Sequence, residues 1–268
     1  MAGLRARRVA TLLGGVLVAL VTVPSVPAVA ASDSPYLAPQ VPVAKGCIVL
    51  DRTWAGNKVF LVQRRLGVVG SRDRFDDATG AAVRQFQRGH GLRATGRVNA
   101  RTWRALDTGR RFCMDRFTVQ PVVADAASRD QRVEAMIGWA RGELGARYIW
   151  GGAGPIGYDC SGLALQAMHA GGLVLPTVTT YLHQRQDFGT ATAIYESGLT
   201  RVPFAQRKRG DLVFWGYRGS MAHMALYLGD GRILEAVRPR VQRASVWSHS
   251  IPIKPFVVRP FTVGQQPA

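Results

Sequence analysis

Acidic residues are scarce in this sequence, which has 17 Asp and Glu against 35 Lys and Arg and a formal net charge of +18. Such a balance predicts an anionic partner and carries no information about the fold. The basic residues are spread along the chain without a long Lys/Arg block, and there is no zinc-finger or RNP-like motif. We therefore expect no nucleic acid as a partner. The alternative interpretation is that the arginine excess reflects genomic composition alone.

Long apolar runs are also lacking, apart from one at the N-terminus. Three arginines precede the apolar stretch 9–23, and Ala28 to Ala30 offer small residues for a signal peptidase. This pattern predicts a secretory signal over residues 1–30, with Sec and Tat export both open. The alternative is a retained anchor, but the stretch is short for a bilayer span and Pro24 follows it. After cleavage we expect no stable membrane insertion, and a monomer.

Cysteine occurs only three times. Cys47 and Cys113 flank one compact segment, and an exported chain meets an oxidising environment, so we predict a disulfide between them. Closing that loop would stabilise the segment by roughly 4 kcal/mol on the chain-entropy model. Two unrelated free thiols are the alternative. The bridge leaves Cys160 as the odd cysteine, available for chemistry.

Composition and periodicity divide the mature chain into two domains. After a disordered leader over residues 31–45, apolar spacing predicts helices over 59–66, over 79–88 and from about residue 99, with Asp77 or Thr79 capping the second. These helices form a small first domain over 46–113. In residues 114–130 the apolar residues show no regular spacing, which is typical of a linker. The second domain, 131–268, opens with a helix from about Asp130.

The most informative stretch is Y-I-W-G-G-A-G-P-I-G-Y-D-C-S-G-L, from Tyr148 to Leu163. Its glycines predict a loop, whereas 161–170 is apolar and helical in pattern. Cys160 therefore stands at a helix N-terminus, where unpaired N–H groups favour a thiolate. We expect the same N–H groups to hold the oxyanion of a tetrahedral intermediate.

A base for this thiol is predicted in S-M-A-H-M-A-L-Y-L-G-D-G-R-I-L-E-A. Two short strands flank a Gly-Asp-Gly turn, with His223 at the start of the first and Glu235 near the end of the second. In an antiparallel hairpin those ends lie side by side, so Glu235 can orient the imidazole of His223. The other histidines fit no catalytic position, and we expect His183 and His249 at the surface.

The first domain resembles the peptidoglycan-binding domain found beside many wall hydrolases. The resemblance rests on V-F-L-V-Q-R-R-L-G, F-D-D-A-T-G-A-A-V-R-Q-F-Q, G-L-R-A-T-G-R-V-N and T-W-R-A-L between residues 59 and 106. It implies a small three-helix wall-binding domain, with peptidoglycan and wall polymers as the partners. A degenerate domain that no longer binds the wall is the alternative.

The second domain resembles the NlpC-type cysteine peptidases of bacterial cell walls. It carries Y-x-W-G-G, D-C-S-G, G-D-L-V-F-W and H-x-A-L-Y-x-G in the order of that family. The resemblance implies an α+β, papain-like fold, in which a nucleophile helix packs on an antiparallel sheet of residues 212–215, 224–228, 233–236 and 255–260. It also implies Cys160 as nucleophile, His223 as base and Glu235 as the third polar residue. Tyr148, Asp159 and Ser161 are then the substrate-binding residues of the cleft.

The activity implied is cleavage of peptidoglycan stem peptides outside the cytoplasm, at the bond from γ-D-glutamate to the diamino acid. No metal or organic cofactor is needed, because Cys160 and His223 lack further ligands at zinc spacing. Two departures from the family are Glu235, where many relatives have His, and Thr177, where an arginine is usual. An amidase or acyltransferase on the same scaffold and a non-catalytic wall-binding protein are the alternatives.

Overall fold

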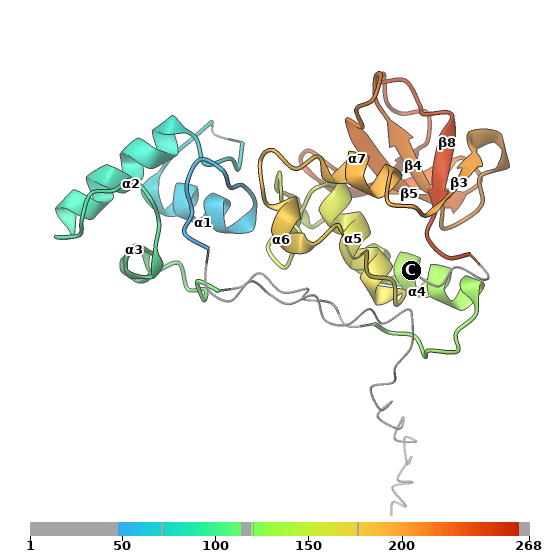
Figure 1. Cartoon of the computed structure of the whole chain (residues 1–268), viewed down its shortest axis with the longest axis horizontal. Helices are drawn as coiled ribbons and strands as arrows, with labels where there is room; N and C mark the ends of the chain where they lie inside the picture. Colours follow the sequence, from blue (N-terminus) through green and yellow to red (C-terminus); the bar gives the residue numbers. More distant parts are fainter. Residues whose placement is uncertain (1–47, 71, 114–118, 120, 176, 263–268) are drawn as a thin grey trace, which may run out of the picture. The chain divides into compact units, whose positions relative to one another are not determined.

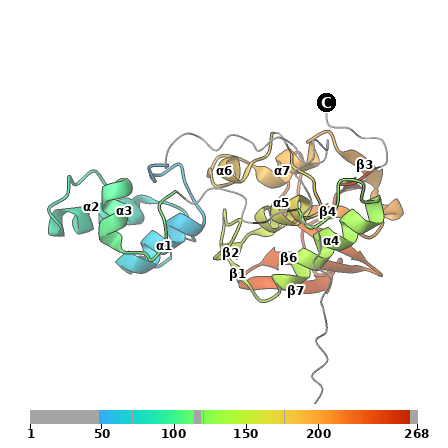
Figure 2. The same cartoon turned by 90° about the horizontal axis from the view of Figure 1, so that it is seen from below.

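A computed structural model describes residues 48–70, 72–113, 119, 121–175 and 177–262. The predicted signal, the leader, Cys47 and most of residues 114–120 lie outside the described residues. Within the described part of the chain, no helix is both long and apolar enough to cross a membrane. Figures 1 and 2 together label the helices and strands.

The first domain has the three helices that the apolar spacing predicts. They are α1 (Asn57–Leu66), α2 (Asp77–Gly89) and α3 (Ala100–Leu106). The side chain of Asp76 caps α2 by accepting from the N–H of Thr79, so the expected cap at Asp77 or Thr79 was wrong by one residue or more. Asn99 caps α3 in the same way. Both caps satisfy N–H groups that have no partner inside the helix.

Two glutamines of the first-domain motifs are buried and hold its loops together. Gln63 donates to the carbonyl of Arg74 over 2.7 Å. Gln87 accepts from the N–H of Gly96 over 2.9 Å and donates to the carbonyl of Arg97 over 2.8 Å. A small apolar core surrounds them, made of residues from all three helices and the connecting loops (Leu50, Val59, Val62, Phe75, Val83, Val98, Trp103 and Leu106). Because buried amides need such partners, these motif positions are structural.

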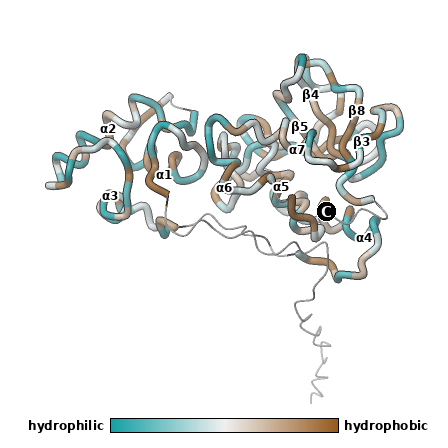
Figure 3. The backbone as a smooth tube through the Cα atoms, in the orientation of Figure 1, coloured by the Kyte–Doolittle hydropathy of each residue, from teal (hydrophilic) through white to brown (hydrophobic). Residues whose placement is uncertain are grey.

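The second domain begins with α4 (Arg129–Gly142), which a capping box at Ser128 and Gln131 starts. Three further helices follow: α5 (Cys160–Ala170), α6 (Thr180–His183) and α7 (Thr190–Tyr195). A single 3-10 turn, Phe204–Gln206, precedes the strand-rich C-terminal half. Helix α5 is apolar on nearly all sides, and Figure 3 draws it largely in the brown of hydrophobic residues. A helix of that composition is expected to be buried all round.

One sheet of eight strands runs through the second domain in the order β2-β1-β7-β6-β5-β4-β8-β3. The strands are β1 (Arg147–Tyr148), β2 (Gly157–Tyr158), β3 (Thr200–Pro203), β4 (Leu212–Trp215), β5 (His223–Gly229), β6 (Arg232–Val237), β7 (Arg240–Ser245) and β8 (Phe256–Arg259). All neighbouring strands are antiparallel except β1 and β2. The α+β class and the four predicted strands are confirmed, whereas β1, β2, β3 and β7 were not predicted.

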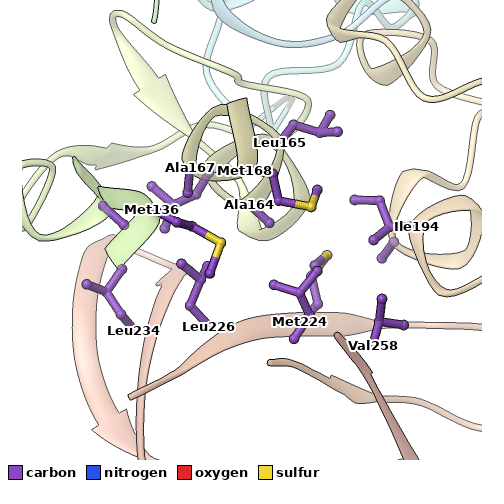
Figure 4. Close-up of a cluster of buried hydrophobic side chains, with 14 of the residues drawn as sticks. Met136, Ala164, Leu165, Ala167, Met168, Ile194, Met224, Leu226, Leu234 and Val258 are labelled. Atoms are coloured by element: carbon purple, nitrogen blue, oxygen red, sulfur yellow. The ribbon is translucent and has the colours of Figure 1, made fainter. Parts of the chain in front are cut away.

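The main core lies between α5 and one face of this sheet. Met168 of α5, Met136 of α4 and Ile194 of α7 meet Met224, Leu226 and Leu234 from the central strands, as Figure 4 shows. Figure 2 shows α4 and α5 on the same side of β6 and β7. A second, smaller cluster that includes Trp215 and Ala225 covers the opposite face. The helix that carries Cys160 is thus fixed on strands β5 and β6, which carry His223 and Glu235.

Candidate active site

Cys160 is the first residue of α5, as the glycine-rich loop before it predicts. Asp159 caps the helix, and its Oδ1 accepts from the N–H groups of Ser161 and Gly162 over 3.1 and 2.9 Å. The Oδ2 atom of Asp159 accepts from the N–H of Gly151 over 2.7 Å. One buried carboxylate therefore holds the glycine-rich loop against the helix that begins with Cys160, the predicted nucleophile.

The close approach of loop and helix requires glycine at position 162. A Cβ atom at Gly162 would lie 2.0 Å from the carbonyl oxygen of Gly152 and 2.9 Å from Nε2 of His183. Such a separation is far inside van der Waals contact, so a larger residue would force the loop away from the helix. The D-C-S-G motif thus has a packing requirement at its last position as well as a chemical one at its second.

His183 lies directly beneath this cap and is buried, so the prediction that it is a surface residue was wrong. Its Nε2 lies 3.2 Å from Oδ1 of Asp159, and its Nδ1 lies 3.0 Å from the hydroxyl of Thr190. Burial opposes charge on both groups, but their mutual attraction outweighs it. The pKa of His183 is raised and that of Asp159 is lowered, the latter helped by the N–H groups of Gly162 and Gly151. The cap and the imidazole are therefore coupled electrostatically inside the protein.

The thiol of Cys160 lies against the start of β5. The backbone N–H of Met224 is a hydrogen-bond partner of the thiolate, and this N–H belongs to the peptide that joins Met224 to His223. Although Cys160 retains some accessible surface, burial of the thiol and the charge of Asp159 raise its pKa to about 12. The helix N-terminus is expected to favour a thiolate but burial opposes it, so the thiol needs the base that the sequence predicts.

Two of the N–H groups that were expected to hold an oxyanion already have a partner. Asp159 already engages the N–H groups of Ser161 and Gly162. The cap leaves the N–H of Cys160 itself as the first-turn donor for an oxyanion, because a side-chain cap satisfies only the second and third positions of the helix. Ser161 is buried, and its hydroxyl lies 3.1 Å from Oδ1 of Asp159.

His223 and Glu235 meet as the predicted hairpin requires. The pairing of β5 with β6 places them diagonally on one face of the sheet, where side chains interact. Nε2 of His223 lies 2.6 Å from Oε2 of Glu235, and both side chains are buried. Gln242 of β7 donates to the other carboxylate oxygen over 3.1 Å. Burial raises the pKa of Glu235, but its hydrogen bonds with His223, Gln242 and His249 lower the pKa by more than burial raises it. The group is therefore a carboxylate.

A second imidazole shares the same carboxylate oxygen. Nε2 of His249 lies 2.7 Å from Oε2 of Glu235, and the rings of His249 and His223 are 4.5 Å apart between centroids. Trp215 packs edge-on against the ring of His249. His249 was predicted at the surface, which is wrong, because its side chain is only 16% exposed. It lies in the loop between β7 and β8, and no local pattern in the sequence marks it.

These contacts determine which nitrogen of His223 can act as a base. A carboxylate only accepts hydrogen bonds, so Nε2 of His223 carries a hydrogen. In the neutral ring the other nitrogen, Nδ1, is then an unprotonated acceptor. Glu235 thus holds His223 in the tautomer that has a basic Nδ1, next to the peptide on which the Cys160 thiol rests.

Tyr148, in β1, lies close enough to Cys160 for their charges to interact. Its ring packs against the main core, and the guanidinium of Arg238 lies 4.9 Å from the ring centroid. Burial, with the charges of Asp159 and Cys160, raises the pKa of Tyr148 far above its ordinary value. The phenol therefore remains a hydrogen-bond donor at any working pH.

The acidic residue of the G-D-L-V-F-W motif, Asp211, lies away from this chemistry. It is buried before β4 and accepts two hydrogen bonds from the guanidinium of Arg259, of 2.8 and 2.7 Å, so its role is structural.

Cys160 is a free thiol. The predicted disulfide remains a prediction, because Cys47 lies outside the described residues.

Two parts of the chain match models of known protein families. Residues 145–258 match the NlpC/P60 family, and residues 55–106 match the putative peptidoglycan binding domain. Peptidoglycan endopeptidase RipA of Mycobacterium tuberculosis is 33% identical over 144 residues, which cover 48% of this chain and 27% of RipA. RipB of the same species is 36% identical over 123 residues, covering 41% of this chain and 45% of RipB. The match therefore spans less than half the length of these curated relatives.

Solved structures similar to the chain include the P60 domain of antigen MAP1204 from M. avium subspecies paratuberculosis. It is 28% identical, with a TM-score of 0.40, and the match covers 49% of this chain and 96% of that one. RipD of M. tuberculosis, described as a non-catalytic NlpC/p60 domain protein adapted to peptidoglycan binding, is 27% identical with a TM-score of 0.38, over 48% of this chain and 97% of RipD. From the matched residues and the observed fold, the chain carries an NlpC/P60 domain preceded by a putative peptidoglycan-binding domain.

Proposed function

We propose that this chain is an exported cysteine peptidase that hydrolyses the stem peptides of peptidoglycan. The observation that carries the proposal is that the Cys160 thiol meets the peptide joining His223 to Met224, while a buried carboxylate orients the His223 imidazole. Relatives named peptidoglycan endopeptidase, including RipA and RipB, support the substrate class. A wall substrate also requires an extracytoplasmic location, in agreement with the predicted signal.

In the proposed reaction, Nδ1 of His223 takes the thiol proton while the sulfur of Cys160 attacks the scissile carbonyl carbon. The C–N bond then breaks, and the protonated imidazole gives its proton to the leaving amine. Water, deprotonated by the same Nδ1, attacks the thioester and releases the new carboxylic acid and the thiol. The high pKa of the isolated thiol means that proton transfer accompanies attack, which is the role of a positioned general base.

Tyr148 and the N–H of Cys160 are the proposed donors to the oxyanion. Both border the thiol, and the raised pKa of Tyr148 keeps its hydroxyl protonated. Asp159 and Ser161 were expected to bind the stem peptide, but both are buried and bonded to each other. We therefore assign them a positioning role, in which they fix the loop and the helix that present Cys160.

The scissile bond that we propose joins γ-D-glutamate to the diamino acid, which is what the family resemblance implies. The basic charge of the chain suits a substrate that is rich in carboxylates. The first domain is proposed to hold the chain on the wall, with peptidoglycan as its ligand. Linked modules raise the local concentration of substrate at the catalytic site.

The alternatives are an amidase or acyltransferase on the same scaffold, and a non-catalytic wall-binding protein such as RipD is described to be. Intact Cys160, His223 and Glu235 favour a catalyst. Digestion of purified disaccharide tetrapeptide, with products identified by mass spectrometry, separates the three. An endopeptidase yields a disaccharide dipeptide and a free dipeptide. An amidase releases the whole stem from the sugar, an acyltransferase joins a stem to an added amine, and a binding protein leaves the substrate intact. Any of these three results would overturn the endopeptidase proposal.

A further inference from the structure

The proposed peptidase chemistry uses one imidazole, yet two share the Glu235 carboxylate. His223 comes from β5, Glu235 from β6 and His249 from the loop before β8. One donor atom from each of the three lies within 4.8 Å of the other two. Both imidazoles present Nε2 to the same oxygen, at 2.6 and 2.7 Å. Three nitrogen and oxygen donors thus converge on one point from three separate segments.

We propose that His223, Glu235 and His249 form a zinc-binding site, and that zinc bound there switches the peptidase off. Two imidazoles and one carboxylate, with water in the fourth position, are a ligand set that tetrahedral zinc takes in enzymes. Calcium and magnesium prefer all-oxygen ligands, so this donor set selects against them. The site lies inside the catalytic group and involves no sulfur ligand.

The geometry needs only a small opening to accept the ion. With bonds of about 2.0–2.2 Å, ligand atoms around tetrahedral zinc lie about 3.3 Å apart. Each imidazole would therefore move away from Oε2 of Glu235 by about 0.7 Å, given the zinc bond lengths. His223 and Glu235 are fixed on paired strands, whereas His249 is in a loop and its side chain is 16% exposed. The loop side is thus the entry path, and His249 is the ligand that adjusts.

Zinc at Nε2 would remove the base by changing the tautomer of His223. At present Nε2 carries the hydrogen and Nδ1 is the basic nitrogen. A zinc ion takes the Nε2 lone pair of neutral imidazole, so the ring hydrogen must be on Nδ1. The proton shifts from one nitrogen to the other, and none is gained or lost by the ring. Nδ1 then has no lone pair with which to take the thiol proton of Cys160.

Binding is tested on the full chain with Cys160→Ala, which removes the thiol as a competing ligand. Titration calorimetry with Zn²⁺ is expected to show one ion per chain, and Mg²⁺ is expected to give no heat. Adding His249→Gln or Glu235→Gln should weaken zinc binding at least about tenfold, because each removes a ligand. The matched control is His90→Gln, an exposed imidazole in the first domain that should leave zinc binding unchanged.

Cobalt distinguishes this site from a thiol site in the chain with Cys160 intact. Co²⁺ in a tetrahedral nitrogen and oxygen site gives visible d–d bands without a thiolate charge-transfer band. The proposal would be overturned by a thiolate band that disappears in Cys160→Ala. It would also be overturned if adding His249→Gln to the Cys160→Ala chain left the zinc affinity unchanged. His249→Asn serves as a second variant if circular dichroism shows that His249→Gln does not fold.

The inhibition rests on the proposed function, whereas the binding does not. Zn²⁺ should stop muropeptide hydrolysis by the wild-type chain, and a chelator should restore it. In His249→Gln, normalised to its own rate without zinc, half-inhibition should need at least about ten times more zinc. Equal sensitivity of the two proteins would mean that zinc acts elsewhere. If no sample hydrolyses the muropeptide, the proposed peptidase function is contradicted. The calorimetry still decides whether zinc binds at this site.

Discussion

Glu235→Ala tests the proposed orientation of the catalytic base. Glu235 is almost wholly buried and accepts three hydrogen bonds, from His223, His249 and Gln242. Without it, His223 can rotate or take the wrong tautomer, although Cys160 and the imidazole remain. A positioned general base contributes about 10²- to 10⁴-fold to the rate, so losing part of that contribution should lower kcat by roughly ten- to a thousandfold.

The same substitution should cost stability by an amount that the contacts allow us to estimate. His249 and Gln242 are partly exposed and can turn to water, whereas the imidazole of His223 stays buried. One buried donor without a partner lowers the free energy of unfolding by about 1–3 kcal/mol. The activity assay must therefore run below the melting temperature of the variant. Glu235→Gln is the matched control, because its carbonyl oxygen can still accept from the imidazole although the charge is lost.

The assay is steady-state hydrolysis of purified muropeptide at saturating substrate, with thermal melts recorded in parallel. We expect kcat to decrease from wild type through Glu235→Gln to Glu235→Ala, with KM changed much less. Gln242→Ala, which removes only a neighbour of the carboxylate, should lie between wild type and Glu235→Gln. Wild-type kcat in Glu235→Ala would refute the reasoning and leave a dyad of Cys160 and His223.

Three further outcomes are expected. His183→Asn should lower the free energy of unfolding. Because the folded-state pKa of His183 is raised, the loss of unfolding free energy should be fully present below pH 6.5 and shrink as the pH rises through the folded-state pKa. The part due to Asp159, whose pKa is lowered, should disappear only in strong acid. Denaturant melts at several pH values measure this loss, and a loss that does not change with pH would contradict the prediction. Gly162→Ala should abolish turnover and lower the melting temperature, since its Cβ would clash with a backbone carbonyl, and a wild-type melt and rate would show that the loop is free to move. Peptide mapping without reduction should find Cys47 joined to Cys113, and a bridge from either to the third cysteine would contradict both the disulfide and the nucleophile.

Much of this architecture is predictable because its signals are local. The apolar period of 161–170 predicts α5, and the glycines before it predict that the helix starts near Cys160. The turn between β5 and β6 predicts that His223 and Glu235 meet, since hairpin pairing follows from the turn itself. The class of the second domain follows from the same elements.

What was missed depends on contacts between distant segments. Helix α6, which carries His183, has four residues and is too short to show a period. Strand β7 (Arg240–Ser245) is mostly polar and alternates between exposed and buried positions, with only Val241 fully buried. His249 stands in a loop whose path is set by the β7 to β8 connection. Sequence spacing therefore placed both histidines at the surface, whereas tertiary packing buries one beneath the nucleophile and sets the other beside the base.

The central claim is that Cys160 is the nucleophile and His223 its base, and turnover of a defined muropeptide tests it most directly. Wild type, Cys160→Ala and His223→Ala would be compared at equal concentration, after circular dichroism has shown that all three are folded. We predict cleavage between γ-D-glutamate and the diamino acid by wild type, and none above background by either variant. Cleavage by Cys160→Ala at the wild-type rate would contradict the account.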